Sequence, residues 1–218
     1  SSTLSYIRAE AERRSVKKAF GLYISTDYMK ELIRDGKALR LGGETREITV
    51  MFTDIRGFTS ISELFDAQGL TRLINRLLTP LTNVILSTQG TIDKYMGDCV
   101  MAFWGAPVET AEHAVRAVET ATEMVQAIEA FNAEGQKRGL PSIGIGIGLN
   151  TGLMCVGDMG SDIRRSYTVI GDAVNLAARC ETGAKSFGIQ TLVTGETRSA
   201  AMAFQDDVVY RYIDRIVV

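Results

Sequence analysis

The chain has little histidine and cysteine and no long apolar run, and each scarcity narrows its chemistry. One histidine in 218 residues, His113, argues against a histidine-based metal site and a Ser-His-Asp triad, and we expect it on the surface of a helix. The three cysteines, Cys99, Cys155 and Cys180, are odd in number and widely spaced, which favours buried reduced thiols over disulfides or zinc ligands. No apolar run approaches the length of a membrane span, and no signal-peptide pattern is visible.

Excess charge of either sign is also lacking, because 24 Lys and Arg residues face 26 Asp and Glu residues. No broad basic surface is expected, so nucleic acid is not an expected partner. A hydrophobic fraction of 45% supports a real core. The length of 218 residues fits one large domain, or one domain with an appendage.

Residues 1–45 are expected to be a helical linker or signalling segment that precedes a domain over residues 46–218. The first 19 residues are charged and helix-prone, with a narrow apolar stripe of Leu4, Ile7 and Ala11. Two interpretations stay open: a frayed terminal helix, or the end of a coiled coil that feeds a signal into the domain. Because the chain does not begin with methionine, we expect a fragment whose membrane anchor could lie outside it.

From residue 46 onward, strand-like and helix-like patterns alternate, which predicts an α+β fold: a mixed sheet with helices packed on it. In chain order we expect a strand over 46–53, a helix over 69–88, a hairpin over 91–104, a helix over 109–134, a strand over 143–149, a hairpin over 151–169, a helix over 171–187, and strands near 189–194 and 208–217. Glycine and isoleucine alternate from Ile143 to Leu149, which indicates that something packs tightly against the glycine face.

Two turn aspartates are the candidate metal ligands. Asp54 ends an apolar strand-like run, and Asp98 lies in the turn of the hairpin predicted over 91–104. Each aspartate alone is more simply explained as a helix cap or an ordinary hairpin residue. If their strands are neighbours, however, one rim of the sheet carries two carboxylates, as a pair of Mg²⁺ ions on a nucleoside triphosphate requires. Free backbone N–H groups near Gly57 could hold phosphate oxygens.

One helix contributes a polar stripe, since Asn175 and Arg179 are four residues apart and share a face. That stripe is either a solvated surface or, beside triphosphate chemistry, a source of transition-state stabilisation from Arg179.

Three basic residues each allow a structural and a functional interpretation. Strand alternation places Lys94 on the same face as Ile92 and Met96, where it either extends to solvent or serves a site. Arg164 and Arg165, in a loop, are either ordinary surface charges or phosphate ligands.

Four stretches together resemble the catalytic domain of class III adenylyl and guanylyl cyclases. They are Phe52–Thr59, Asp93–Asp98, Ile147–Gly152 and Tyr167–Arg179, and they occur in the family's order and spacing. The resemblance covers about residues 46–217. It implies a ferredoxin-like or palm-type βαββαβ core, and a reaction that converts a nucleoside triphosphate to a cyclic nucleotide and pyrophosphate.

The resemblance also implies metal and catalytic roles. Asp54 and Asp98, with the carbonyl of Ile55, would hold two Mg²⁺ ions per site, and Mn²⁺ is an expected substitute. One ion would activate the ribose 3′-hydroxyl for attack on the α-phosphate. Asn175 would orient the ribose, and Arg179 would stabilise the transition state.

Base selection in the family falls on the positions of Lys94 and Thr168. A lysine donates to adenine N1 and a threonine hydroxyl can accept from the exocyclic amine, whereas guanine presents the opposite pattern. Family guanylyl cyclases typically place glutamate at the position of Lys94, so we expect ATP. Many adenylyl cyclases carry aspartate at the position of Thr168, which puts this chain in the threonine-bearing bacterial subgroup, some of whose members respond to bicarbonate. The expected substrate-binding residues are Lys94, Thr168, Gly57, Phe58, Thr59 and Arg164.

Family sites form between two catalytic domains, and this chain contains both sets of residues. The resemblance therefore implies a homodimer with two shared active sites, acting as the cytoplasmic output domain of a signalling protein whose upstream sensor can be membrane-bound. The family usually continues into a strand whose lysine contacts the triphosphate, so we expect that region to be truncated here. Two alternatives stay open: a guanylate cyclase, and a non-catalytic nucleotide-binding or dimerisation module.

Overall fold

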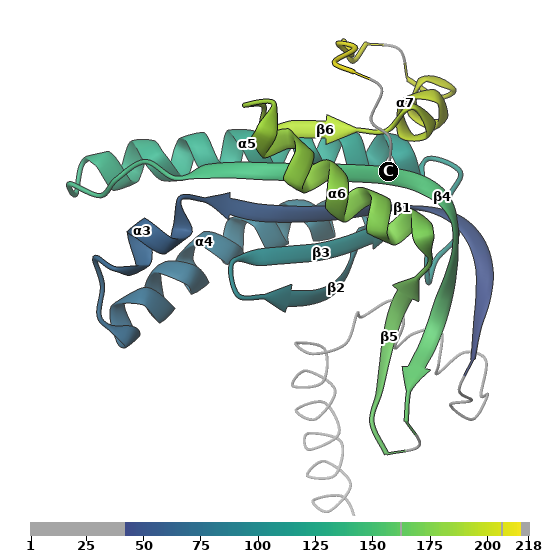
Figure 1. Cartoon of the computed structure of the whole chain (residues 1–218), viewed down its shortest axis with the longest axis horizontal. Coiled ribbons are helices and arrows are strands. Elements are labelled where there is room, and N and C mark those ends of the chain that lie inside the picture. The colour runs from purple at the N-terminus through teal and green to yellow at the C-terminus, as the bar shows by residue number, and fades with distance from the viewer. Residues whose placement is uncertain (1–41, 162, 206, 215–218) are drawn as a thin grey trace, which may run out of the picture. The chain divides into compact units, whose positions relative to one another are not determined.

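The computed structural model describes residues 42–161, 163–205 and 207–214 (Figure 1). The predictions for residues 1–41 lie outside this range. The strands are β1 (Gly42–Arg56), β2 (Thr91–Met96), β3 (Cys99–Trp104), β4 (Gly144–Gly160), β5 (Arg165–Ile170) and β6 (Thr191–Val193). The helices are α3 (Phe58–Ser62), α4 (Ala67–Ser87), α5 (His113–Gln136), α6 (Asp172–Ser186) and α7 (Gly195–Met202).

The sheet has the strand order β2-β3-β1-β4-β5, and β6 pairs with β4 beside this path. The β4–β6 pair is parallel and the other pairs are antiparallel, so the sheet is mixed. The sequence of elements confirms the predicted α+β fold with a βαββαβ core and helices packed on the sheet.

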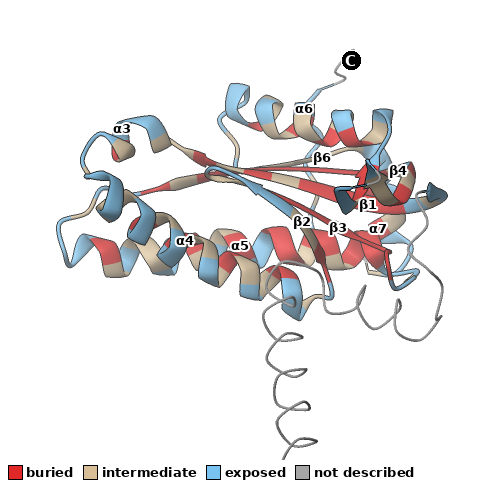
Figure 2. Ribbon diagram, turned by 90° about the horizontal axis from the view of Figure 1, so that it is seen from below, coloured by how far each residue is buried: buried red, intermediate tan, exposed pale blue. Residues whose placement is uncertain are grey.

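Helices cover the two faces of the sheet unequally, with α4 and α5 on one face and α6 on the other (Figure 2). Alternate residues of β1 supply the two faces, since Met51 and Ile55 join the core under α4 and α5 while Ile48 and Val50 join the core under α6. We call these the helix-pair face and the α6 face.

The glycines of β4 explain how closely α6 packs. A Cβ atom at Gly148 would collide with backbone atoms of Ala177 and Glu181. The predicted tight packing against the glycine face is therefore confirmed, and its partner is α6.

Two strand predictions were wrong in part. We expected one strand over 143–149 and a separate hairpin over 151–169. The hairpin forms between β4 and β5, but β4 runs unbroken through Asn150 and Gly152, because β1 pairs with it along residues 144–158. Residues 207–214 contain no strand; Val208 and Tyr210 pack instead against the helix-pair core.

His113 is not a surface residue. It is 8% exposed, and its Nδ1 lies 2.8 Å from the hydroxyl of Thr49. Burial is the main cause that lowers the pKa of His113, and Glu47 partly opposes it.

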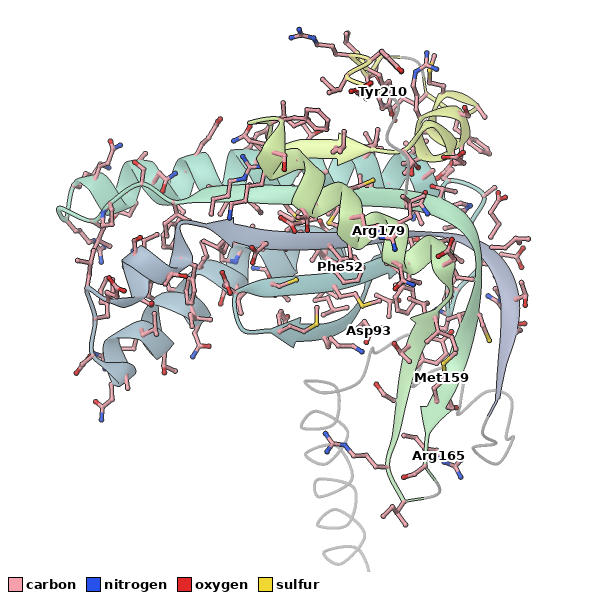
Figure 3. The ribbon with its side chains drawn as sticks, viewed as in Figure 1. Phe52, Asp93, Met159, Arg165, Arg179 and Tyr210 are labelled. Atoms are coloured by element: carbon pink, nitrogen blue, oxygen red, sulfur yellow. The ribbon has the colours of Figure 1, made fainter. Side chains whose placement is uncertain are left out.

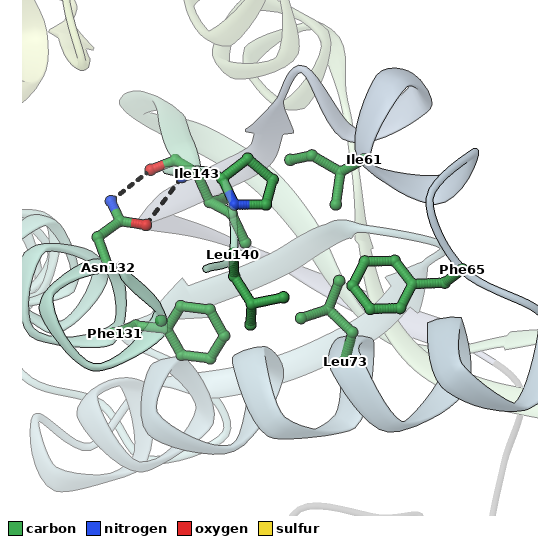
Figure 4. Close-up of a pocket in the computed structure, with 9 residues that line it drawn as sticks. Ile61, Phe65, Leu73, Phe131, Asn132, Leu140 and Ile143 are labelled. Carbon is green, nitrogen blue, oxygen red and sulfur yellow. Dashed lines mark hydrogen bonds between the residues drawn. The ribbon is translucent and has the colours of Figure 1, made fainter. Parts of the chain in front are cut away.

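A small apolar recess lies beside α3 and is lined partly by Ile61, Phe65 and Phe131 (Figure 4). At its rim the Asn132 amide forms two hydrogen bonds of 2.8 Å with the backbone of Ile143, one donated and one accepted. These bonds attach α5 to the start of β4. Within the described residues, no helix is long and apolar enough to cross a membrane.

Candidate active site

The pairing of β1 with β3 brings the two candidate metal aspartates together. Thr53 pairs with Val100, so the next residue along β1, Asp54, faces the end of β3 beside the Gly97–Asp98 turn. Burial, and then interaction with Asp54, raises the pKa of Asp98, while backbone hydrogen bonds from Asp98 itself and Ile55 oppose the rise. The two carboxyl groups therefore lie close enough to interact, at the same rim of the sheet, as expected if the strands were neighbours.

This pair fits a magnesium site that substrate completes. Within the described residues, no group of three or more His, Cys, Asp or Glu side chains could hold a metal alone. Mg²⁺ usually takes one or two protein carboxylates and fills its remaining positions with water and phosphate oxygens. Two half-buried carboxyl groups this close together repel each other when ionised, and a divalent cation would remove that repulsion.

The predicted phosphate loop follows Asp54 in the chain. Gly57 has φ +73°, a left-handed conformation that glycine adopts without strain, and it begins the short helix α3. No side chain caps α3. Phe58 packs against the helix-pair core, and Thr59 is exposed. Ile55 buries its side chain on the helix-pair face.

The rotation of α6 separates its polar stripe from the metal pair of the same chain. The side chain of Glu181 lies over Gly146, the residue of β4 that pairs with Asp54, since its Oε1 would be 2.7 Å from a Cβ atom there. Burial, and then the charge of Asp54, raises the pKa of Glu181. Arg179 lies about 200° around the helix from Glu181 at 100° per residue. Asn175 and Arg179 are both exposed.

The nearby thiol of Cys99 is not a reactive group. Burial, followed by the charge of Asp54, raises its pKa to about 11, so the thiol stays protonated at neutral pH. All three cysteines are free; Cys180 is buried, as expected, whereas Cys99 and Cys155 are only partly buried.

We predicted that Lys94 shares a face with Ile92 and Met96, but it does not share the face of Ile92. A bulge between Ile92 and Lys94 shifts the register, so Ile92 pairs with Ala102 whereas Lys94 pairs with Met101. Ile92 therefore joins the helix-pair core, and Lys94 lies on the α6 face with Met101. Strict alternation failed because Asp93 is the inserted residue.

The structure brings the two base-selecting candidates together through Asp93. The hydroxyl of Thr168, on β5, donates a hydrogen bond to Asp93 Oδ2, and Lys94 Nζ lies 3.2 Å from Asp93 Oδ1. Strands β2 and β5 are distant in the strand order, so the sheet must curl for them to meet. Figure 3 shows Asp93 between these two strands.

Arg164 stands apart from the other candidates. It is exposed in the turn between β4 and β5, where Ser161 accepts from its backbone N–H at 3.2 Å. Figure 3 places the neighbouring Arg165 at the far end of this hairpin.

Comparison with known proteins decides the family. Residues 43–216 match the family model described as the adenylate and guanylate cyclase catalytic domain. The chain belongs to this cyclase family. Cyclase catalytic domains of this family depend in general on divalent metal ions.

Two curated relatives of the cyclase domain are bacterial adenylate cyclases. Adenylate cyclase 1 of Rhizobium meliloti (strain 1021) is 36% identical over 180 residues, which are 81% of this chain and 26% of the relative. An adenylate cyclase of Anabaena cylindrica is 38% identical over 178 residues, which are 79% of this chain and 34% of the relative. The chain thus spans about a quarter to a third of the length of these proteins.

Solved structures of both substrate types resemble this cyclase domain. The adenylyl cyclase CyaB from P. aeruginosa is 36% identical with a TM-score of 0.69, over 75% of this chain and 84% of that one. The guanylyl cyclase Cya2 is also 36% identical, with a TM-score of 0.67 over 74% of this chain and 81% of that one. Overall similarity therefore does not separate ATP from GTP as substrate.

The sequence analysis missed two residues that lie beside the candidate site residues, namely Asp93 and Glu181. Asp93 gave one signal, an acidic residue next to the unusual Lys94, but its contact with Thr168 spans 75 positions and depends on sheet curvature. Glu181 gave none, because its position follows from how α6 rotates on the glycines of β4.

Proposed function

We propose that this chain is the catalytic domain of an adenylate cyclase that converts ATP to 3′,5′-cyclic AMP and pyrophosphate. The observation that carries the proposal is the proximity of the Asp54 and Asp98 carboxyl groups at the rim of a cyclase-family sheet. The bacterial adenylate cyclases among its relatives support ATP as the substrate.

Each site residue has a distinct task in the proposed reaction. Asp54, Asp98 and the Ile55 carbonyl hold two Mg²⁺ ions, which activate the ribose 3′-hydroxyl and neutralise phosphate charge. The loop that begins at Gly57 offers backbone N–H groups to the triphosphate. Arg179 donates hydrogen bonds to the α-phosphate oxygens as negative charge develops there.

Asn175, Lys94 and Thr168 position the rest of the nucleotide. Asn175 orients the ribose so that its 3′-oxygen approaches the α-phosphate in line. Lys94 donates to adenine N1, and the Thr168 hydroxyl accepts from the exocyclic amine. Phe58, Thr59 and Arg164 remain proposed substrate contacts.

We infer that two copies of the chain share each site. The orientation of α6 supports this, because Glu181 lies over the β4 residue that pairs with the chain's own Asp54 while Arg179 points elsewhere. A second copy related by a two-fold axis could bring its Asn175 and Arg179 to the first copy's aspartates, which gives two equivalent sites.

The domain is proposed to act as the output of a longer signalling protein. Its relatives are three to four times longer than the matched segment, which leaves room for sensor modules. ATP as substrate and three free cysteines support a cytoplasmic location.

The direct test is product analysis with ATP and GTP in the presence of Mg²⁺ or Mn²⁺. Cyclic AMP as the main product is expected, and Asp54→Ala should abolish it. Cyclic GMP as the main product would support a guanylate cyclase instead. Nucleotide binding without any cyclic product would favour a non-catalytic module.

A further inference from the structure

Asp93 is a buried carboxylate beside Lys94 and Thr168, the two residues proposed to select the base. Its side chain is 0% exposed. Burial of a charge is costly unless specific partners compensate it. The β-bulge that Asp93 creates in β2 brings it onto its partners, since a bulge redirects side chains locally.

The first partner of Asp93 is the hydroxyl of Thr168. A threonine hydroxyl has one proton to donate and two lone pairs, so alone it can face either a donor or an acceptor on a base. In this structure the proton is directed at Asp93 Oδ2. An ionised carboxylate only accepts, so Thr168 is left with lone pairs alone for any further partner.

The second partner of Asp93 is Lys94, whose Nζ lies 3.2 Å from Oδ1. Among the described residues, Oδ1 accepts no hydrogen bond, so Lys94 is its compensating charge. An ammonium group has three donors, and this contact leaves others free for a ligand. Lys94 is 46% exposed, so a ligand can reach it.

We propose that Asp93 is the positioning residue that makes this site selective for adenine over guanine. It fixes the Thr168 hydroxyl as an acceptor and holds the Lys94 ammonium beside it as a donor. Adenine complements this pair with its N1 acceptor and exocyclic amine donor, whereas guanine presents an N1–H donor and an O6 acceptor. The inference rests on the proposed function only in assigning Lys94 and Thr168 to the base.

Asp93→Asn is the sharpest variant because it keeps the size of the side chain. The Lys94 ammonium would attract the amide oxygen, which turns the amide NH₂ toward Thr168. The Thr168 hydroxyl then accepts from the amide and directs its proton at the base, a pattern that suits guanine O6. Glu134→Gln is the matched control, since it removes one negative charge on α5, where Glu134 pairs with Lys137 and Arg138.

Binding of 3′-deoxy-ATP and 3′-deoxy-GTP with Mg²⁺, measured by calorimetry, tests this proposal. These analogues lack the attacking hydroxyl, so affinity is read without turnover. Loss of one discriminating hydrogen bond predicts that Asp93→Asn lowers the ATP-over-GTP affinity ratio by about tenfold. Glu134→Gln should leave the ratio unchanged, and the melting temperature of each variant reports any structural effect.

Repeating the Asp93→Asn substitution in a Thr168→Asp chain tests whether Asp93 acts through the Thr168 hydroxyl. In Thr168→Asp the new carboxylate is itself an acceptor, and it repels Asp93. Adding Asp93→Asn should then raise the adenine preference or leave it unchanged, which reverses the sign seen with Thr168. An equal fall of the ATP-over-GTP affinity ratio in both backgrounds would overturn the proposal. An unchanged ratio in Asp93→Asn would also overturn it, as would a wild-type chain that binds the two analogues equally or binds neither. Selective binding by a chain that forms no cyclic product would sink the cyclase proposal alone.

Discussion

The two faces of the sheet are built from the same strands but have opposite characters. The helix-pair face is closed by α4 and α5 over a continuous apolar core that includes Leu77, Leu81 and Trp104. The α6 face is covered by one helix, has a smaller apolar cluster, and carries Asp54, the proposed metal ligand, at its edge. Strand alternation thus lets one face form most of the apolar core while the other carries the proposed catalytic residues.

Removing a proposed metal ligand on the α6 face should give the largest effect, a loss of activity without a loss of stability. Asp54→Ala should lower cyclase activity on the order of 10³-fold or more, because metal-bound charge stabilisation contributes several kcal/mol. The melting temperature should stay the same or rise, since the change relieves repulsion between two carboxyl groups. Steady-state turnover and thermal unfolding check both parts. A variant that keeps most of its activity would contradict the metal role.

A core truncation on the helix-pair face should instead lower stability and leave activity unchanged. Leu81 is 1% exposed, so Leu81→Ala should lower the free energy of unfolding by about 2–5 kcal/mol. Activity per folded molecule should change little. Leu86→Ala on the same helix is the control, because Leu86 is 55% exposed. Denaturant unfolding measures the difference, and equal losses in both variants would refute the burial argument.

Gly148→Ala should lower both stability and activity. The added methyl group would collide with the α6 backbone at Ala177 and Glu181, and such overpacking costs about 1–3 kcal/mol. Because α6 also carries Arg179, turnover should fall together with stability. Gly195→Ala is the control, since nothing lies within 4 Å of its added Cβ. If Gly148→Ala lost stability but kept full turnover, the position of α6 would not matter to the chemistry.

The smallest expected effect is an acid sensitivity of the helix-pair face. The pKa of buried His113 is lowered in the fold, so below about pH 6.5 the unfolded chain binds more protons than the folded one. This contribution to stability is full above that pH and is lost as the pH falls. His113→Gln should make the free energy of unfolding depend less steeply on pH. Denaturant unfolding measured between about pH 5 and pH 8, in steps of about one pH unit, checks this. An unchanged slope would assign the sensitivity to other groups.

Local patterns in the sequence predicted most of the fold and, within the candidate site, the proximity of Asp54 and Asp98. Apolar periodicity predicted the long helices, and the glycine alternation from Ile143 to Leu149 predicted a tightly packed neighbour. That proximity followed once β1 and β3 were neighbours.

What the sequence could not reveal depends on long-range geometry. The bulge at Asp93 inverted the face of Lys94, because one extra residue reverses strand alternation. The strand predicted to end at residue 149 continues through Asn150 and Gly152, because pairing with β1 extends along residues 144–158. His113 looked exposed because its partner Thr49 lies 64 positions away.

The central claim, that two chains share each active site, is tested most directly by mixing two inactive variants. Asp54→Ala removes the metal ligand from one chain, and Arg179→Ala removes the transition-state donor from the other. After equal mixing and subunit exchange, half of the dimers are mixed and each has one intact site of two, so about a quarter of wild-type activity is predicted. A mixture that stays as inactive as its components, although the subunits exchange, would contradict the claim.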